Sequence, residues 1–228
     1  MANFDALIFD VDGTLADTER DGHRVAFNRA FREAGLDWEW SAELYGSLLG
    51  VTGGKERIRH YLDYHNRTFD RPADLAGFVA DLHRRKTRHY SAMMEQGTIP
   101  LRPGVERLLR EARDAGVRLA VATTTTPENV SALVRSTLPD GAMDWFEVIG
   151  AGDIVPRKKP APDIYEWVLR EMQLKGGNVI AFEDSAHGLR AARDAGIDRV
   201  VVTVNGYTAA QDFSAASVVL DTLGDVGA

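Results

Sequence analysis

The sequence contains no cysteine. Disulfide bonds, thiolate nucleophiles and cysteine-based zinc sites are therefore excluded. Long hydrophobic runs are also missing. The first apolar run, Ala6–Phe9, is followed at once by Asp10 and Asp12 and has no basic segment before it, so a signal peptide is not indicated. No run approaches the ~20 apolar residues that a membrane-spanning helix needs. We therefore expect a cytoplasmic protein with no membrane partner.

An excess of positive charge is missing as well. The chain has 27 Lys and Arg residues against 34 Asp and Glu residues, which gives a formal net charge of −7. A general nucleic-acid binder needs a basic surface to neutralise phosphates, so this class of protein is not expected. The length of 228 residues, with 44% hydrophobic and 27% charged residues, is typical of a globular chain of one or two domains.

Short apolar or β-branched runs alternate with helical patterns along most of the chain. The runs expected to form strands are 6–9, 117–122, 148–149, 179–182, 200–202 and, at the edge, 218–220. Near-continuous apolar strands are typical of a parallel sheet that is covered on both faces. The pattern predicts an α/β fold with a doubly wound, Rossmann-like parallel sheet.

One stretch, residues 17–97, shows no strong strand. Helical patterns cover residues 23–34, the region around 58–62 and residues 75–94. We interpret this stretch as an inserted all-helical domain. The core is then expected to consist of residues 1–16 and 98–228.

Acidic pairs follow two of the expected strands. Asp10 and Asp12 follow the first strand, and Glu183 and Asp184 end the fourth. Because ligands bind at the carboxyl ends of strands in open parallel sheets, the four acids are candidates for one cation site, and all-oxygen ligands favour Mg²⁺. Taken separately, the first pair could be an ordinary turn and the second a helix N-cap. An EF-hand loop is excluded, because Leu15 stands where that loop needs glycine.

Polar residues end another strand and precede a later helix. A run of four threonines, 123–126, follows the second strand, and its hydroxyl and N–H groups could hold phosphate oxygens. The segment Arg157-Lys158-Lys159-Pro160 places a basic cluster before a helix that begins near Pro162. Alone, these features are more often a strand end and a solvated loop.

Together, the four features occur in the order of the four motifs of the haloacid-dehalogenase superfamily of phosphotransferases, which the chain resembles. The matching residues are Asp10 and Asp12, Thr123, Lys159, and Glu183 with Asp184. The resemblance covers essentially the whole chain, and residues 17–97 resemble that superfamily's type-one cap. Dehalogenases of the superfamily lack the second acid, so the presence of Asp12 favours phosphoryl transfer.

The resemblance implies a mechanism. Asp10 attacks phosphorus and forms an aspartyl-phosphate, and Asp12 protonates the leaving oxygen and then activates water. The implied Mg²⁺ ligands are Asp10, the backbone carbonyl of Asp12, and Asp184, with Glu183 as a further ligand or a support. Thr123, the N–H of Thr124, and Lys159 are implied to hold the transferring phosphoryl group.

Other segments are similar to one branch of the superfamily, the CbbY branch of Calvin-cycle organisms. They are residues 17–23, 52–57, 101–104 and 152–156. The implied activity is hydrolysis of xylulose 1,5-bisphosphate to xylulose 5-phosphate, and a monomer is expected. Two alternatives stay open: a phosphohexomutase of the β-phosphoglucomutase type, and a non-catalytic phosphoreceiver or metabolite sensor.

A bisphosphate needs a second anion site, and the insertion offers candidates. Lys55 follows a glycine turn that opens an expected helix, and Lys86 ends a basic run on another. Glu19 and His23 are candidates for contact with sugar hydroxyls or for gating, although a satisfied, partly buried histidine is an equal interpretation of His23. Arg102, near the second crossing into the core, either contacts phosphate or only holds the hinge.

Overall fold

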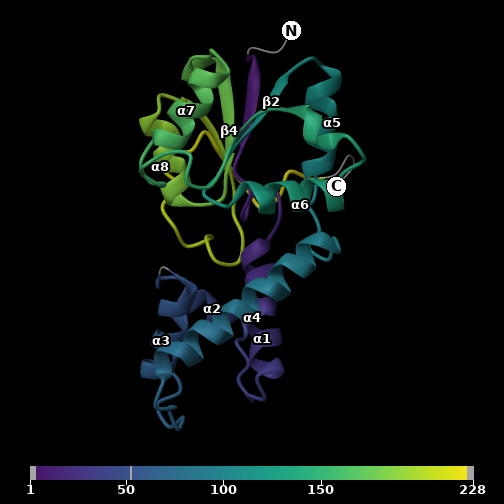
Figure 1. The fold of residues 1–228 in the computed structure, drawn as a ribbon. Helices are drawn as coiled ribbons and strands as arrows, with labels where there is room; N and C mark the ends of the chain where they lie inside the picture. The colour runs from purple at the N-terminus through teal and green to yellow at the C-terminus, as the bar shows by residue number, and fades with distance from the viewer. Residues whose placement is uncertain (1–3, 52, 225–228) are drawn as a thin grey trace. The chain divides into compact units, whose positions relative to one another are not determined.

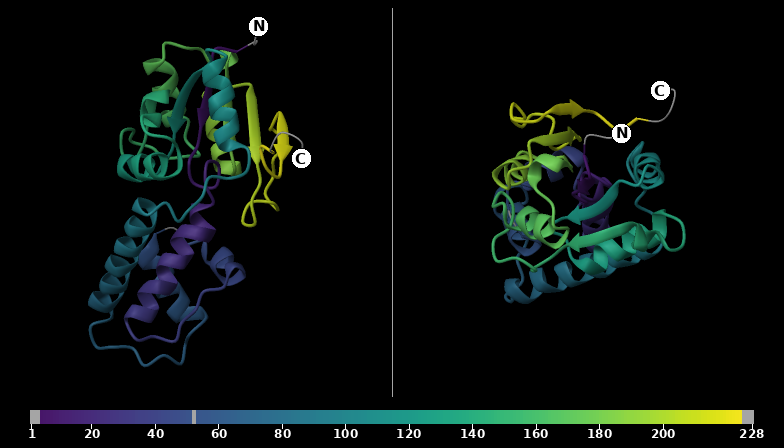
Figure 2. Two further views of the ribbon diagram at one scale, coloured as in Figure 1. Left: turned by 90° about the vertical axis from the view of Figure 1, so that its right-hand side faces the viewer. Right: turned by 90° about the horizontal axis from the view of Figure 1, so that it is seen from above.

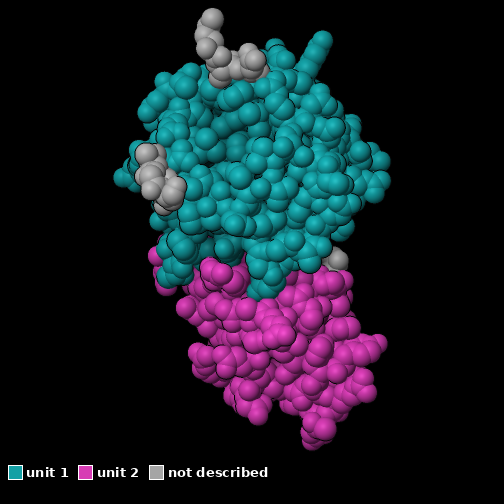
Figure 3. All heavy atoms as spheres, turned by 180° about the vertical axis from the view of Figure 1, so that it is seen from behind, with its two compact units in different colours: residues 1–17, 97–228 teal, residues 18–96 magenta. Residues whose placement is uncertain are grey.

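The computed structural model describes residues 4–51 and 53–224. Thr52, which belongs to one of the branch-specific segments, lies outside the described residues. Within them, the chain divides into two compact units, residues 1–17 with 97–228 and residues 18–96, coloured separately in Figure 3. The sequence analysis predicted a core of residues 1–16 and 98–228 and an insertion of residues 17–97.

Unit 1 is built on a six-stranded sheet in which every neighbouring pair is parallel (Figure 1). The strands are β1 (Ala6–Phe9), β2 (Arg118–Ala122), β3 (Phe146–Gly150), β4 (Val179–Glu183), β5 (Arg199–Thr203) and β6 (Val218–Leu220). They lie in the order β3-β2-β1-β4-β5-β6, with the exposed β6 at one edge (Figure 2). The expected strands and the doubly wound α/β class are confirmed.

Helices cover both faces of this sheet, as the apolar strands require. The helices of unit 1 are α5 (Val105–Asp114), α6 (Pro127–Thr137), α7 (Asp163–Glu171) and α8 (Ala186–Asp194), with short 3₁₀ turns η2 (Ala142–Trp145) and η3 (Gly176–Asn178). Side chains of α7 and α8 form one buried cluster with Ala6 and Ile8 of β1. Helix α5 lies on the other side of the sheet (Figure 1), as right-handed crossovers dictate.

Local sequence signals begin the helices that follow strands β2 and β4. Thr126 accepts a hydrogen bond from the N–H of Asn129, and Pro127 stands in the first turn of α6. Ser185 accepts in the same way from the N–H of Gly188 at the start of α8. These caps end each strand sharply, so the residues between strand and helix lie at the carboxyl edge of the sheet.

The strand order places β1 beside β4 at the centre of the sheet. The chain runs from β1 outward to β2 and β3, then returns to β4 on the other side of β1. This reversal is a topological switch point, where open α/β sheets bind ligands. Phe9 pairs with Phe182, so the acidic residues that follow both strands lie next to each other.

Unit 2 is all-helical and has a core of its own. It begins with a π-helical segment, η1 (Thr18–His23), which continues into α1 (Arg24–Glu33), and it contains α2 (Ala42–Leu48), α3 (Gly54–Tyr64) and α4 (Leu75–Glu95). Trp40, Phe27, Phe31 and Tyr45 are fully buried and contact one another through their rings. Helix α2 was not expected from the sequence pattern, because seven residues are too few for a clear helical period.

Among the residues that the structure describes, no helix is long and apolar enough to cross a membrane.

Candidate active site

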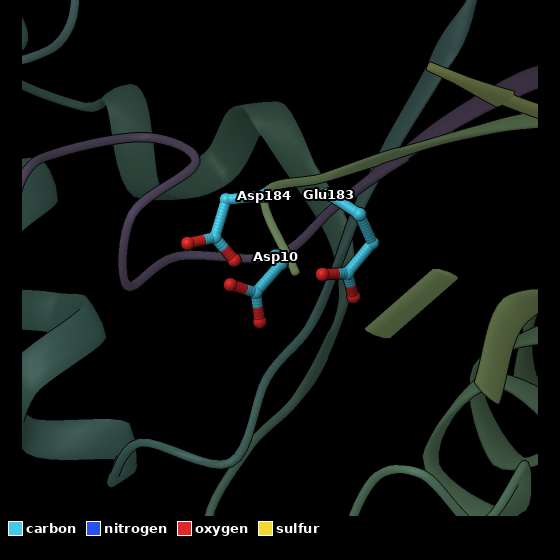
Figure 4. A group of neighbouring side chains, drawn as sticks. All are labelled: Asp10, Glu183 and Asp184. Carbon is cyan, nitrogen blue, oxygen red and sulfur yellow. The ribbon is translucent and has the colours of Figure 1, made fainter. Parts of the chain in front are cut away.

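Three carboxylates meet at the carboxyl ends of β1 and β4. Asp10, Glu183 and Asp184 are all buried, and each offers an oxygen within 4.8 Å of those of the other two. Figure 4 shows the three side chains extending into the same space from two neighbouring strands. Burying three like charges together is unfavourable unless cations balance them.

The ammonium group of Lys159 supplies part of that balance. It lies 2.6 Å from Asp10 Oδ1 and 2.6 Å from Glu183 Oε1, and it donates to the carbonyl oxygen of Ala122 at 2.8 Å. Burial alone would lower the pKa of Lys159, but the negative charges of Asp10 and Glu183 outweigh burial and raise that pKa. The lysine is therefore a permanent cation that ties together β1, the end of β2 and β4.

Glu183 is held by a second donor that the sequence analysis did not single out. The hydroxyl of Tyr165, on α7, donates to Glu183 Oε1 at 2.6 Å. Glu183 Oε2 is buried and has no hydrogen-bond partner among the described residues. It lies against Gly188 of α8, where a Cβ atom would overlap the carboxylate. The lack of a side chain at position 188 makes room for Glu183.

Asp184 is oriented by Asn205, a second residue that the sequence analysis missed. Asn205 Nδ2 donates to Asp184 Oδ2 at 2.8 Å. On the same side, Gly13 adopts a φ of +87°, and a Cβ atom there would overlap Asp184 Oδ2. Because left-handed backbone favours glycine, the turn after Asp12 can approach the carboxylate this closely.

The electrostatics of the group fit a divalent cation. Burial raises the pKa of Glu183 to about 7, and burial together with the charge of Asp10 raises the pKa of Asp184 well above its ordinary value. Three carboxylates and one ammonium leave two uncompensated negative charges in the ionised group. The donors are all oxygen, the set that Mg²⁺ prefers. The residues present therefore fit the implied metal.

The other expected residues of the core lie around this group. Thr123 is buried and directly follows Ala122, whose carbonyl contacts Lys159, whereas Thr124 is exposed. Asp12 is half-buried in the turn after β1. Thr123 N–H donates to the carbonyl of Gly150 at 2.9 Å, which fixes the end of β2 against β3.

Three of the four expected residues of unit 2, Glu19, His23 and Lys86, lie in two hydrogen-bonded groups. Glu19 Oε2 accepts from the hydroxyl of Tyr45 at 2.6 Å, and this hydroxyl in turn accepts from Arg57 Nη1 at 2.7 Å. His23 Nδ1 lies 2.7 Å from Lys86 Nζ. Burial and the charge of Lys86 lower the pKa of His23 well below its ordinary value. His23 is therefore neutral at physiological pH, and its Nδ1 accepts from the ammonium group.

Lys86 is buried, and its ammonium group also lies over the rings of Tyr90 and Phe27, at 5.0 and 5.2 Å from their centroids. Lys55 is exposed in the first turn of α3, and its charge contributes to a lowered pKa of His83, after burial and Lys86. Lys55 and Lys86 are thus two cations of unit 2 whose charges act on neighbouring histidines.

Arg102 is buried, and its guanidinium donates to backbone carbonyl groups. Of the two interpretations made from the sequence, phosphate contact and a structural hold near the crossing, this geometry favours the second. The sequence carried no sign of the partners of Arg102, because they follow β1, β5 and β6, far away along the chain.

The comparisons with known proteins identify the family of the chain. The family model described as haloacid dehalogenase-like hydrolase matches residues 4–196. The chain belongs to the haloacid dehalogenase-like hydrolases, which confirms the resemblance drawn from its four motifs.

Within that family, the chain is similar to CbbY proteins. It is 48% identical to Protein CbbY of Cereibacter sphaeroides over 223 residues, which cover 98% of this chain and 94% of that protein. It is 50% identical to the plasmid Protein CbbY of Cupriavidus necator over 223 residues, 96% of this chain and 86% of that protein. The crystal structure of CbbY from Rhodobacter sphaeroides in complex with phosphate superimposes with a TM-score of 0.79 at 47% identity, covering 98% of this chain and 96% of that one. A mutant of that protein has been crystallised with xylulose 1,5-bisphosphate.

A substitution at Gly188 tests whether this glycine provides the space that the Glu183 carboxylate occupies. We expect Gly188→Ala to lower the free energy of unfolding by about 1–3 kcal/mol, because the added methyl overlaps a buried carboxylate. Gly177→Ala is the matched control, since nothing lies within 4 Å of a Cβ atom there; its change should stay within about 0.5 kcal/mol. Urea unfolding followed by circular dichroism measures both. Equal effects of the two substitutions would contradict the assignment.

The raised carboxyl pKa values predict a pH dependence of stability. At low pH these carboxyls are protonated in both the folded and the unfolded chain. As pH rises, the unfolded chain loses the protons first, because its carboxyl pKa values are lower. The metal-free folded state therefore becomes less stable until the pH passes the folded-state pKa. Asp184→Asn removes one such group. In EDTA, the free energy of unfolding of Asp184→Asn should increase relative to that of the parent protein between pH 5 and 7. The expected slope is about 1.4 kcal/mol per pH unit for each proton that the folded parent holds and the unfolded parent has lost.

Chemical denaturation at each pH measures this difference. The exposed Asp198→Asn serves as the control and should show no such trend. Saturating Mg²⁺ should reverse the advantage of Asp184→Asn at pH 7, because the ion displaces the protons. A difference that stays constant with pH would contradict the assigned burial of Asp184.

Proposed function

We propose that this chain, a phosphoric monoester hydrolase of the haloacid dehalogenase-like family, hydrolyses xylulose 1,5-bisphosphate to xylulose 5-phosphate and phosphate, with Mg²⁺ as cofactor. The observation that carries the proposed chemistry is the buried group of Asp10, Glu183 and Asp184 around Lys159. The substrate rests on the similarity to CbbY from Rhodobacter sphaeroides, which has been crystallised with that bisphosphate.

Asp10 is the proposed nucleophile. Its carboxylate follows β1 at the switch point, and its Oδ1 is paired with Lys159 at 2.6 Å. That pairing orients the carboxylate. Attack by the carboxylate on phosphorus expels the sugar oxygen and leaves an aspartyl-phosphate, which water then hydrolyses.

Asp12 is the proposed acid and base. Two residues after the nucleophile, it protonates the departing sugar oxygen and then takes a proton from the attacking water. Gly13, with its left-handed backbone, turns the chain directly after Asp12. A carboxyl that speeds hydrolysis would work against a stable phospho-switch, which disfavours the sensor alternative.

The phosphoryl group is held by cationic and polar groups at the ends of the strands. Lys159, the hydroxyl of Thr123 and the N–H of Thr124 are proposed to bind its oxygens. Asp10, Asp184, the backbone carbonyl of Asp12 and, as ligand or support, Glu183 are proposed to hold Mg²⁺. When bound, the ion screens the carboxylate of Asp10 from the anionic phosphate.

The cations of unit 2 are proposed to bind the second phosphate of the substrate. Lys55 and Lys86 supply the charge, and the neutral His23, hydrogen-bonded to Lys86, orients it. Glu19, fixed by Tyr45, is proposed to accept from a sugar hydroxyl. This division assigns chemistry to unit 1 and substrate selection to unit 2.

Replacing the nucleophile tests the mechanism. We expect Asp10→Asn to abolish phosphate release, at least 10³-fold, because an amide does not attack phosphorus. Asp5→Asn, just before the opposite end of the same strand, is the matched control and should retain activity, since the Asp5 side chain accepts a hydrogen bond from Asn178, away from the acidic group. Retained turnover in Asp10→Asn would refute the assignment.

The substrate panel for the parent protein contains xylulose 1,5-bisphosphate, ribulose 1,5-bisphosphate, glucose 1-phosphate and p-nitrophenyl phosphate, each with Mg²⁺ and with EDTA. Preferential, Mg²⁺-dependent phosphate release from the first supports the proposal. Conversion of glucose 1-phosphate to glucose 6-phosphate with little phosphate release would instead identify a mutase.

Removing one cation of unit 2 tests the second phosphate site. We expect Lys55→Ala to raise KM for xylulose 1,5-bisphosphate roughly tenfold, the loss of one charge-assisted hydrogen bond. Its KM for p-nitrophenyl phosphate, which has one phosphate, should not change. Arg59→Ala, an exposed cation further along α3, is the control and should alter neither value. A parallel change in both substrates would argue against a distal phosphate at Lys55.

A further inference from the structure

Arg102 connects three segments that follow different strands. The residue is 8% exposed, and its backbone N–H donates to the carbonyl of Leu15 at 2.8 Å. Its guanidinium donates to four backbone carbonyl oxygens, those of Gly13, Thr203 (2.9 Å), Val204 (2.6 Å) and Asp221 (2.8 Å). Four carbonyl groups from three strand ends thus converge on one buried cation.

The first of these contacts reaches the Asp184 carboxylate through Gly13. Arg102 Nη1 donates to the carbonyl of Gly13. The Cα of Gly13 lies so close to Asp184 that a Cβ atom would overlap Oδ2. A shift of the turn after Asp12 would therefore either open space beside Asp184 or push into it.

The second contact reaches the same carboxylate from the other side. Arg102 Nη2 donates to the carbonyl of Val204, and the next residue, Asn205, donates its side-chain amide to Asp184 Oδ2. The turn at Asn205 is closed by Thr208, whose Oγ1 accepts from the Asn205 N–H at 3.0 Å. Arg102 thus holds the segment that carries the side-chain donor to Asp184.

We propose that Arg102 is a positioning residue for Asp184: by holding the Gly13 turn and the Val204–Asn205 segment together, it sets the orientation of this carboxylate toward the cation site. The inference rests on the proposed function only for the identity of the ion. Besides the backbone carbonyl groups, the guanidinium contacts the hydroxyl of Thr203 and the carboxylate of Asp17, the latter at 3.5 Å. It acts through the backbone of its neighbours.

Lysine at this position tests the geometry while keeping the charge. A single ammonium group cannot reproduce the planar fork that reaches separate carbonyls on two nitrogens. We expect Arg102→Lys to raise the apparent dissociation constant for Mg²⁺ about tenfold, the size typical of losing a residue that orients a metal ligand. The constant is obtained from the rise in Tm with Mg²⁺ alone, without substrate.

Arg107→Lys is the matched control. Arg107 Nη2 donates to the carbonyls of Leu223 and Gly224, in the segment after β6 that Arg102 also contacts. Among the described residues, Arg107 has no hydrogen bond to residue 13 or 204. It should leave Mg²⁺ binding unchanged. An equal loss in both variants would overturn the proposal, since it would assign the effect to the segment after β6 in general.

A second measurement does not depend on activity or on the ion. Amide hydrogen exchange in EDTA should become about tenfold faster in Arg102→Lys at residues 13–16 and at Asn205, Tyr207 and Thr208, whose N–H groups bond inside the two turns. Exchange in α7 should stay unchanged. Unchanged exchange in both turns would overturn the proposal even if activity were lost.

Two further arms keep the test decisive. If Arg102→Lys does not fold, Thr203→Val, which removes only the Oγ1 acceptor of Arg102 Nη1 at 3.2 Å, should give a smaller, about threefold, rise in the same constant. With enough Mg²⁺ to saturate the variant, kcat of Arg102→Lys should recover toward the parent value, and persistent loss would overturn the proposal.

If the parent shows no phosphatase activity, the proposed function fails, while the exchange measurement still decides the role of Arg102.

Discussion

The ion pairs of Lys159 are the interaction on which the rest of the site depends. One ammonium group lies 2.6 Å from two carboxylates on neighbouring strands and also contacts the end of a third strand. Without it, three acids would be buried at one point with no cation among them, and burial would strongly disfavour their charged forms. With the lysine in place, the switch point of the sheet carries both acids and a cation, the groups that the proposed Mg²⁺ and phosphate sites require.

Neighbouring residues of unit 1 stabilise this group of buried charges by fixing the orientation of each carboxylate. Tyr165 and Asn205 each hold one carboxylate, and two glycines provide the space that the carboxylates occupy. Arg102 holds the backbone of the two turns that flank Asp184. Buried polar groups of this kind are stable only when their partners are present, so the site and the surrounding fold stabilise each other.

The two units carry different parts of the proposed activity. Unit 1 contains the carboxylates, the lysine and the threonine at the strand ends, which suit transfer of a phosphoryl group. Unit 2 has its own aromatic core, which allows a helical surface with several cations to be specified independently of the sheet. Chemistry and substrate selection can therefore change separately in such a chain.

The parallel α/β class, the positions of the strands and the candidate acids and lysine could be predicted from the sequence, because apolar period and motif order are local signals. Helix α2 could not be predicted, because it is too short for a clear period. The contacts of Tyr165, Asn205 and Arg102 became visible in the folded chain, because each of these residues acts on a partner that is distant in the sequence. These partners become adjacent when β1 and β4 pair and the turns after β1 and β5 meet.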